Sequence, residues 1–290
     1  MLGTGYYRGW VLANGVRTHY WWAGTDGPAV VLLHGGGPGS SGEAGWRFML
    51  PALAEAGFRA FAPDQLGFGW TDARPHAWPV LGHQSLVDHI HDFVETLCLD
   101  ELFLVGNSQG AYVAAKYAID HPERVRRLFL IASGTIATAM GVEWPGRDTN
   151  PGLLAIRDYD YTPEGVRRFL ETVVNNKASI TDELCRARAE ISNRPGIREA
   201  TQAFQDYVAR MQREPKLRQR FSLADALPKL AIPIKFVWGK QDSFAPVEMG
   251  YALQQLLPHA EFEFIDGNHQ LQTDDPERVN RLVIEWFRRG

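Results

Sequence analysis

The sequence is poor in cysteine, in net charge and in long apolar runs, and each shortage excludes a class of protein. Its two cysteines, Cys98 and Cys185, lie far apart without metal-ligand spacing, so neither a disulfide framework nor a zinc site is predicted. A formal charge of −4 over 290 residues provides no basic field for nucleic acid or an anionic membrane. No segment approaches the roughly 20 apolar residues that cross a bilayer, and MLGTGYYRGW does not resemble a signal peptide. We therefore expect a cytoplasmic protein that needs no metal and no cofactor.

The remaining composition is ordinary for a globular enzyme, with 45% hydrophobic and 22% charged residues. Short apolar runs alternate along the chain with segments of helical periodicity. The runs predict strands at residues 29–33, 58–62, 102–105, 128–132, 234–238 and 262–265. The helical segments are residues 46–56, 85–97, 111–121, 247–257 and 276–288. This alternation predicts an α/β fold with a mostly parallel central sheet, preceded by a hairpin at residues 9–22 that turns at Asn14-Gly15.

The alternation stops between residues 135 and 227, where no buried-strand pattern occurs. Loops with glycine and proline separate helical stretches at residues 163–174, 182–191 and 197–211. The simplest interpretation is a helical cap, residues 135–227, inserted into a core domain made of residues 1–134 and 228–290.

The most informative stretch is Gly106-Asn107-Ser108-Gln109-Gly110, which follows an apolar strand and opens a helix rich in alanine. A strand, a Gly-x-Ser-x-Gly turn and a helix form the context of a nucleophile elbow, in which a strained turn exposes the serine above the sheet. The alternative interpretation is a simple Gly-Ser turn between buried elements. The flanking strand and helix favour Ser108 as a nucleophile.

A second stretch, from His34 to Gly39, places a run of glycines directly after the strand at residues 29–33. Glycines at a strand end let backbone N–H groups approach a ligand closely and face a developing oxyanion. A flexible glycine loop is the alternative, but such a loop seldom begins with histidine. We expect His34 to brace the loop rather than to take part in chemistry.

A nucleophilic serine needs a histidine base and a carboxylate that orients it, and in this fold the order is serine, acid, histidine. Asp242 follows the strand at residues 234–238, and His269 follows the strand at residues 262–265. Asp242 could instead be a turn aspartate, but Ser133-Gly134-Thr135, after the strand at 128–132, offers no carboxylate. The other candidate bases, His121 and His259, are predicted at the wrong end of the sheet. Ser108, Asp242 and His269 are the predicted triad.

With these motifs in place, the sequence resembles the α/β-hydrolase superfamily over nearly its whole length. Within it the sequence is similar to the meta-cleavage product hydrolases, which cut carbon–carbon bonds in 2-hydroxy-6-oxo-dienoates formed during aromatic degradation. His34 to Gly39 matches the family's H-G-G-G-P-G, and Gly106 to Ser108 matches its G-N-S. Thr181 to Leu184 followed by Arg188 resembles the cap helix that carries the family's carboxylate-binding arginine.

The resemblance implies roles for individual residues. Ser108 would attack the distal ketone, while Asn107 and Arg188 would hold the dienoate end; the planar guanidinium of arginine suits a carboxylate. The oxyanion would be stabilised by the backbone N–H groups of Gly36, Gly37 and Gln109. The alternative for Arg188 is a solvated helix residue, with competing arginines at Arg186, Arg194 and Arg198. The resemblance also implies a small-molecule substrate that carries a carboxylate, and a homo-oligomer, either a dimer or a tetramer.

The sequence departs from the family pattern at three positions near the predicted site. Gln270 follows the catalytic histidine where the family has tryptophan, Phe48 replaces an asparagine two residues after Trp46, and Gln109 replaces a methionine. Gln270 and Phe48 are therefore candidate substrate-binding residues of altered chemistry.

Three functions remain open at this point: hydrolysis of a carbon–carbon bond, hydrolysis of an ester or lactone, and ligand binding by a receptor. An esterase or lactonase would use the same triad, and a ligand receptor would keep the triad mainly for binding. Haloalkane dehalogenases and epoxide hydrolases need a carboxylate nucleophile, which Ser108 does not provide.

Overall fold

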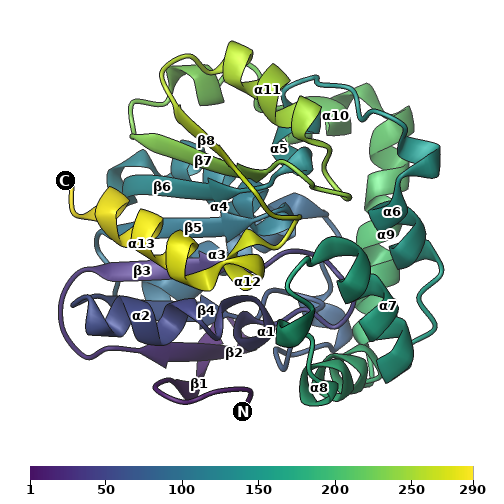
Figure 1. Cartoon of the computed structure of the whole chain (residues 1–290), viewed down its shortest axis with the longest axis horizontal. Helices are drawn as coiled ribbons and strands as arrows, with labels where there is room; N and C mark the ends of the chain where they lie inside the picture. The colour runs from purple at the N-terminus through teal and green to yellow at the C-terminus, as the bar shows by residue number, and fades with distance from the viewer. Residues whose placement is uncertain (290) are drawn as a thin grey trace.

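The computed structural model describes residues 1–289, and its centre is an eight-stranded sheet in the order β1-β2-β4-β3-β5-β6-β7-β8 (Figure 1). The strands are β1 (Tyr7–Ala13), β2 (Val16–Ala23), β3 (Ala29–Leu33), β4 (Arg59–Pro63), β5 (Leu102–Asn107), β6 (Val125–Ile131), β7 (Ile234–Gly239) and β8 (Glu261–Ile265). From β4 to β8 neighbouring strands are parallel, whereas β1 and β2 join antiparallel. The predicted α/β class and mostly parallel sheet are confirmed.

The predicted hairpin joins β1 to β2 with Ala13 opposite Val16. Its two turn residues, Asn14 and Gly15, have φ angles of 45° and 84°. Both lie in the left-handed region that asparagine and glycine tolerate best, which is why Asn-Gly marks this turn.

Helices cover both faces of the sheet. One face packs against α2 (Met49–Glu55) and α13 (Pro276–Phe287), while the other packs against α3 (His83–Thr96), α4 (Gln109–Asp120) and α11 (Val247–Leu256). Figure 1 shows α2 and α13 in front of the sheet and α3 and α4 behind it. The strands are apolar on both faces because each face is covered, as in β3, where all five residues are buried.

The predicted helix at residues 46–56 is wrong in detail, since two helices occupy this region. Here α1 (Gly42–Trp46) begins at Ser41, whose Oγ accepts a hydrogen bond from Ala44 N, and α2 begins afresh at Met49. A continuous helix would require an N–H at Pro51 to reach Arg47, and proline has none. A further short helix, α12 (Leu271–Asp274), follows β8 and was not predicted.

Between β6 and β7 the chain forms six α-helices, and in the part of the chain that the structure describes this segment contains no strand. They are α5 (Gly134–Ala139), α6 (Pro151–Arg157), α7 (Pro163–Val173), α8 (Asp182–Ser192), α9 (Ile197–Arg213) and α10 (Pro215–Phe221). Figure 1 shows α6 to α9 together beside the sheet, at the right of the view. Short 3₁₀ turns occur at 75–77, 122–124, 147–149, 177–179 and 227–229.

We propose that this insertion is a cap with its own small core. Val166, Phe169 and Leu170 of α7 pack against Leu184 and Cys185 of α8 in a buried cluster separate from the two clusters on the sheet. The proposed boundary at residue 135 falls inside α5, whose buried residues pack with the sheet. Within residues 1–289, no helix is long and apolar enough to cross a membrane.

A buried hydrogen bond between side chains joins the amino-terminal hairpin to the centre of the sheet. Asp64 follows β4, and its Oδ2 lies 2.8 Å from Nδ1 of His19 in β2, with both side chains almost inaccessible. Asp64 also accepts hydrogen bonds from the backbone N–H groups of Gly42 (2.6 Å) and Trp70 (2.8 Å). Burial by itself raises the pKa of the Asp64 carboxyl, but His19 and the N–H donors hold that pKa below its usual value.

We expect Asp64→Asn to lower the free energy of unfolding at pH 7 by about 1–3 kcal/mol, because an amide replaces the buried carboxylate that contacts His19 Nδ1 and accepts the N–H groups of Gly42 and Trp70. The folded-state pKa of Asp64 is depressed, so its stabilisation is complete above the unfolded value of about 3.9 and is lost as the pH falls through the folded value. Urea denaturation from pH 7 into acid should show the wild-type advantage narrowing below about pH 4. Asp100→Asn, at an exposed carboxylate, is the control. Equal stability of Asp64→Asn and wild type at pH 7 would contradict this role.

Candidate active site

Ser108 lies at a sharp turn between β5 and α4 with φ 56° and ψ −119°, a conformation that residues other than glycine rarely adopt. Both motif glycines are required by close backbone packing. A Cβ on Gly106 would lie 2.5 Å from Ala111 N, and one on Gly110 would lie 2.1 Å from the carbonyl oxygen of Leu33. Ser108 N donates to Ile131 O at 2.9 Å, which ties the turn to β6. The turn therefore holds the Ser108 side chain at the carboxyl edge of the sheet.

The structure brings Asp242 and His269 together from the loops after β7 and β8. Nδ1 of His269 lies 3.0 Å from Oδ2 and 3.2 Å from Oδ1 of Asp242. Oδ1 also accepts the backbone N–H groups of Phe244 (2.9 Å) and Ala245 (2.7 Å), so the carboxylate is fixed in place. Ser108 and His269 line the same cavity. This arrangement suits a carboxylate that orients an imidazole base towards a serine nucleophile.

The loop that carries His269 is held by residues that the sequence analysis missed. Oδ1 of Asn268 accepts the N–H groups of His269 and Ser243, each at 2.9 Å, and its Nδ2 donates to Thr172 O in α7. Asp274 in turn accepts Asn268 N at 2.6 Å. Burial raises the pKa of the Asp274 carboxyl, although backbone N–H donors oppose that shift. This network couples His269, the predicted base, to the proposed cap, and no local sequence motif marks it.

The glycine loop after β3 lies against the elbow. A Cβ on Gly35 would lie 3.3 Å from Ser108 Cβ, and one on Gly36 would lie 2.6 Å from Oε1 of Gln109. The absence of side chains here leaves the loop backbone open beside the serine, as an oxyanion site requires. His34 braces the loop, since its Nδ1 donates to Gly35 O at 2.8 Å and its Nε2 accepts from Gln65 N at 3.2 Å. Burial lowers the pKa of His34, which favours the neutral imidazole that this pattern needs.

Arg188 is buried in α8 and points at the same loop rather than into solvent. Its Nε donates to Pro38 O at 2.8 Å, and its Nη2 donates to Pro38 O and, at 3.2 Å, to Ser40 Oγ. Its Nη1 makes no hydrogen bond, and no carboxylate within residues 1–289 forms an ion pair with the guanidinium. Burial lowers the pKa of Arg188 to about 10, so the side chain stays charged at neutral pH. Because Arg188 also lines the cavity at Ser108, it places an unpaired cation there.

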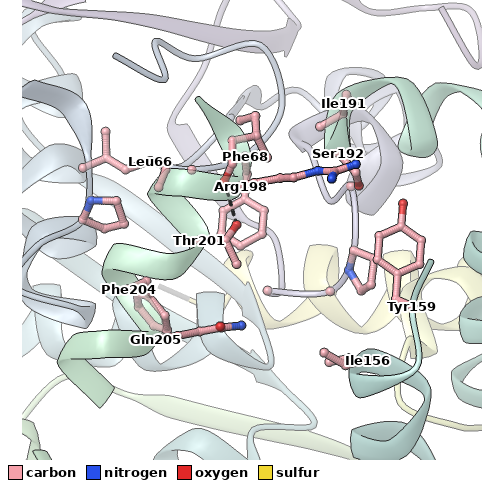
Figure 2. Close-up of a pocket in the computed structure, with 18 of the residues that line it drawn as sticks. Leu66, Phe68, Ile156, Tyr159, Ile191, Ser192, Arg198, Thr201, Phe204 and Gln205 are labelled. Atoms are coloured by element: carbon pink, nitrogen blue, oxygen red, sulfur yellow. Dashed lines mark hydrogen bonds between the residues drawn. The ribbon is translucent and has the colours of Figure 1, made fainter. Parts of the chain in front are cut away.

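The cavity has two compartments that meet at Gly36, Gly37, Gln109 and Ile156. The serine compartment, of about 170 Å³, is lined by Ser108, His269, Arg188, Asn107 and Gln270, among others. The outer compartment, of about 210 Å³, lies between the glycine loop and helices of the proposed cap (Figure 2). Gln109 lines both compartments, so the predicted oxyanion donors lie where the two meet.

Of the predicted substrate-binding residues Phe48 and Gln270, only Gln270 lines the cavity. Phe48 does not line either compartment: it lies between α1 and α2, 36% exposed, under the guanidinium of Arg47. The prediction for Phe48 is wrong because Trp46 takes the buried position in this region and leaves Phe48 on the outside. Gln270 does line the serine compartment. Gln272, which was not predicted, is buried in α12 and lines it as well.

Asn107 lies beside the serine and makes contacts within the protein. Its Nδ2 donates to Ile131 O at 3.3 Å and to His269 O at 3.2 Å, so it ties the elbow to the loop that carries His269.

Across residues 1–289, no three His, Cys, Asp or Glu side chains gather in a way that could hold a metal ion.

A mostly parallel sheet with helices on both faces, a strained serine at a strand-to-helix turn, and a paired histidine and aspartate on later loops define a class of hydrolytic enzymes. The chain belongs to the α/β-hydrolase family, because a model of the alpha/beta hydrolase fold matches residues 28–276.

Curated relatives and solved structures agree with this assignment. The chain is 32% identical over 277 residues to a 2-hydroxy-6-oxononadienedioate/2-hydroxy-6-oxononatrienedioate hydrolase of Burkholderia vietnamiensis, covering 94% of this chain and 92% of the relative. It is 33% identical over 281 residues to a 2-hydroxy-6-oxo-2,4-heptadienoate hydrolase of Pseudomonas putida, with 96% and 95% covered. A solved meta-cleavage product hydrolase from Pseudomonas fluorescens IP01 gives a TM-score of 0.78 at 30% identity, with 97% of both chains covered. The resemblance to meta-cleavage product hydrolases and the expectation of an enzyme are confirmed.

We expect Asp242→Asn to lower kcat for any substrate by about 10⁴-fold, because an amide in place of the carboxylate leaves the imidazole of His269 in the wrong tautomer. The side-chain oxygen of asparagine can still accept the N–H groups of Phe244 and Ala245, so the fold should be retained. Hydrolysis of p-nitrophenyl acetate measures the effect. Asp266→Asn, an exposed carboxylate just after β8, is the matched control. If Asp266→Asn were the damaging change, Asp242 would not be the acid.

Proposed function

We propose that this enzyme hydrolyses a carbon–carbon bond in a 2-hydroxy-6-oxo-dienoate, using Ser108, His269 and Asp242. His269 takes the proton of Ser108 as Oγ attacks the ketone carbon, and the N–H groups of Gly37 and Gln109 stabilise the oxyanion. The bond between carbons 5 and 6 then breaks. This cleavage requires the 2-keto tautomer of the substrate, in which the hydroxyl proton of carbon 2 has moved to carbon 5. The electron pair of the broken bond is then delocalised from carbon 5 through the double bond between carbons 3 and 4 onto the oxygen of carbon 2, and that oxygen takes the proton from His269. Water, deprotonated by His269, hydrolyses the remaining acyl ester and regenerates Ser108.

The observation that carries this proposal is the unpaired cation of Arg188 beside the nucleophile. A buried charge without a partner is costly, so a site that retains one is suited to a ligand that supplies the opposite charge. Arg188 uses Nε and Nη2 on the glycine loop, and Nη1 has no partner within residues 1–289. The carboxylate of a dienoate would pair with the guanidinium of Arg188 while the ketone of the same dienoate lies at Ser108.

The relatives support the same chemistry, since the two curated proteins are named as hydrolases of 2-hydroxy-6-oxo acids. An esterase or lactonase would use the same triad but has no need of Arg188 as a cation. The homo-oligomer implied by the family resemblance stays a prediction.

We expect the wild-type protein to cleave a coloured 2-hydroxy-6-oxo-dienoate and Ser108→Ala to lose at least about 10⁴-fold of that rate, because the nucleophile is absent. Loss of the dienoate absorbance gives the rate, and mass spectrometry should find a carboxylic acid and a 2-hydroxypentadienoate. Ser222→Ala, at an exposed serine, is the control. Hydrolysis of p-nitrophenyl acetate without any action on the dienoate would favour an esterase or lactonase. Binding without turnover of either compound would favour a receptor.

We expect Arg188→Gln to slow both dienoate and p-nitrophenyl acetate turnover, because Arg188 also fixes the glycine loop through Pro38 and Ser40. The dienoate should lose a further ten- to hundredfold in kcat/KM, since a charge-assisted contact contributes about 1.5–3 kcal/mol. Arg186→Gln, an exposed arginine in the same helix, is the matched control. An equal loss on both compounds would make Arg188 purely structural and would contradict its role in binding a carboxylate.

A further inference from the structure

Gln272 is a buried amide without a hydrogen-bond partner in the described part of the protein. It lies in α12, three residues after His269, and the residue is only 3% exposed. Its Oε1 is inaccessible and has no partner within residues 1–289, and its Nε2 makes no hydrogen bond in that range either. A buried amide without partners costs free energy, so Gln272 is a candidate for direct contact with a ligand.

Gln272 and Arg188 lie in the same part of the cavity. Both line the serine compartment, and neither is among the residues of the outer compartment (Figure 2). The helix of Gln272, α12, packs against α1, which begins just after Ser40, and Ser40 Oγ accepts a hydrogen bond from Arg188. A dienoate with its ketone at Ser108 and its carboxylate at Arg188 would therefore bring its carboxylate end beside Gln272.

The oxygen of carbon 2, next to the carboxylate, is the atom of that end on which charge develops. When the bond between carbons 5 and 6 breaks, conjugation carries the electron pair from carbon 5 to this oxygen. The oxygen is neutral in the 2-keto tautomer and anionic once the bond has broken. A hydrogen-bond donor placed there stabilises the transition state more than the bound substrate, so it raises kcat.

The other side-chain donors of the serine compartment are less suited to this oxygen. Nε and Nη2 of Arg188 hold the glycine loop, and Nδ2 of Asn107 donates to two backbone carbonyl oxygens. Gln109 lies at the junction with the outer compartment, on the ketone side. Gln270 is half-buried, so its amide can be solvated. Gln272 combines burial, a free amide and a place away from the outer compartment.

We propose that Gln272 is a catalytic residue whose Nε2 donates a hydrogen bond to the oxygen of carbon 2 while the carbon–carbon bond breaks. This inference rests on the proposed function. No atom of Gln272 is transferred: the electron pair reaches the oxygen, the oxygen takes its proton from His269, and Gln272 stabilises the negative charge in between. p-Nitrophenyl acetate has no such oxygen, so Gln272 should not contribute to its hydrolysis.

We expect Gln272→Met to lower kcat for a 2-hydroxy-6-oxo-dienoate by about 10²-fold, with little change in KM, because the lost contact forms only as charge develops. Turnover of p-nitrophenyl acetate should be unchanged. Tm should rise, because methionine has a similar length and removes an unsatisfied buried amide. Gln254→Met, at an exposed glutamine of α11, is the control and should alter neither rate.

A spectroscopic measurement reports on the same contact without turnover. Ser108→Ala should bind the dienoate intact, and ionisation of the 2-hydroxyl of the bound dienoate shifts its absorbance to longer wavelength. A donor to that oxygen favours the ionised form, so adding Gln272→Met to Ser108→Ala should raise the pKa of the bound 2-hydroxyl by about 1 or more. Adding Gln254→Met should leave this pKa unchanged.

The outcomes separate the two proposals. An equal loss on the dienoate and on p-nitrophenyl acetate, a change confined to KM, or an unchanged pKa of the bound 2-hydroxyl would overturn the role of Gln272 and leave the proposed function intact. Turnover of p-nitrophenyl acetate by wild type with no action on the dienoate would overturn the proposed function, and this inference would fall with it.

Discussion

The site depends on one close approach, in which the first turn of α4 packs against the end of β3. Gly110 permits it, because any Cβ there would lie 2.1 Å from the carbonyl oxygen of Leu33. The approach places Ser108 next to the glycine loop. A Cβ added to Gly35 in that loop would lie 3.3 Å from the Ser108 Cβ. The proposed nucleophile and the proposed oxyanion donors are thus positioned by the same contact, so their geometry is set before any ligand binds.

A second constraint joins the helical insertion to this site. Arg188 in α8 reaches the glycine loop at Pro38, and Asn268 beside His269 reaches Thr172 in α7. Contacts between residues more than 90 positions apart in the sequence therefore hold both the glycine loop and the loop that carries His269. Because Arg188 is cationic and also holds the loop, the same side chain would link the shape of the loop to the charge of the proposed substrate.

Much of the fold could be predicted from the sequence because the strands are continuous apolar runs, and the hairpin carries Asn14-Gly15 at its turn. The elbow and the positions of Asp242 and His269 follow from strand order, since the carboxyl ends of parallel strands share one edge of the sheet. Phe48 was misplaced because a sequence pattern cannot show which of two neighbouring aromatic residues is buried. Asn268 and Gln272 could not be predicted, because their places in the site depend on contacts between segments that are far apart in the sequence.

The most direct test of the account is a crystal structure of Ser108→Ala with a 2-hydroxy-6-oxo-dienoate that has a neutral ketone-side group. The account predicts the carboxylate within hydrogen-bond distance of Arg188, the ketone oxygen at the N–H groups of Gly37 and Gln109, and the ketone-side group in the outer compartment. A dienoate bound in the reverse orientation, with its carboxylate remote from Arg188, would contradict it.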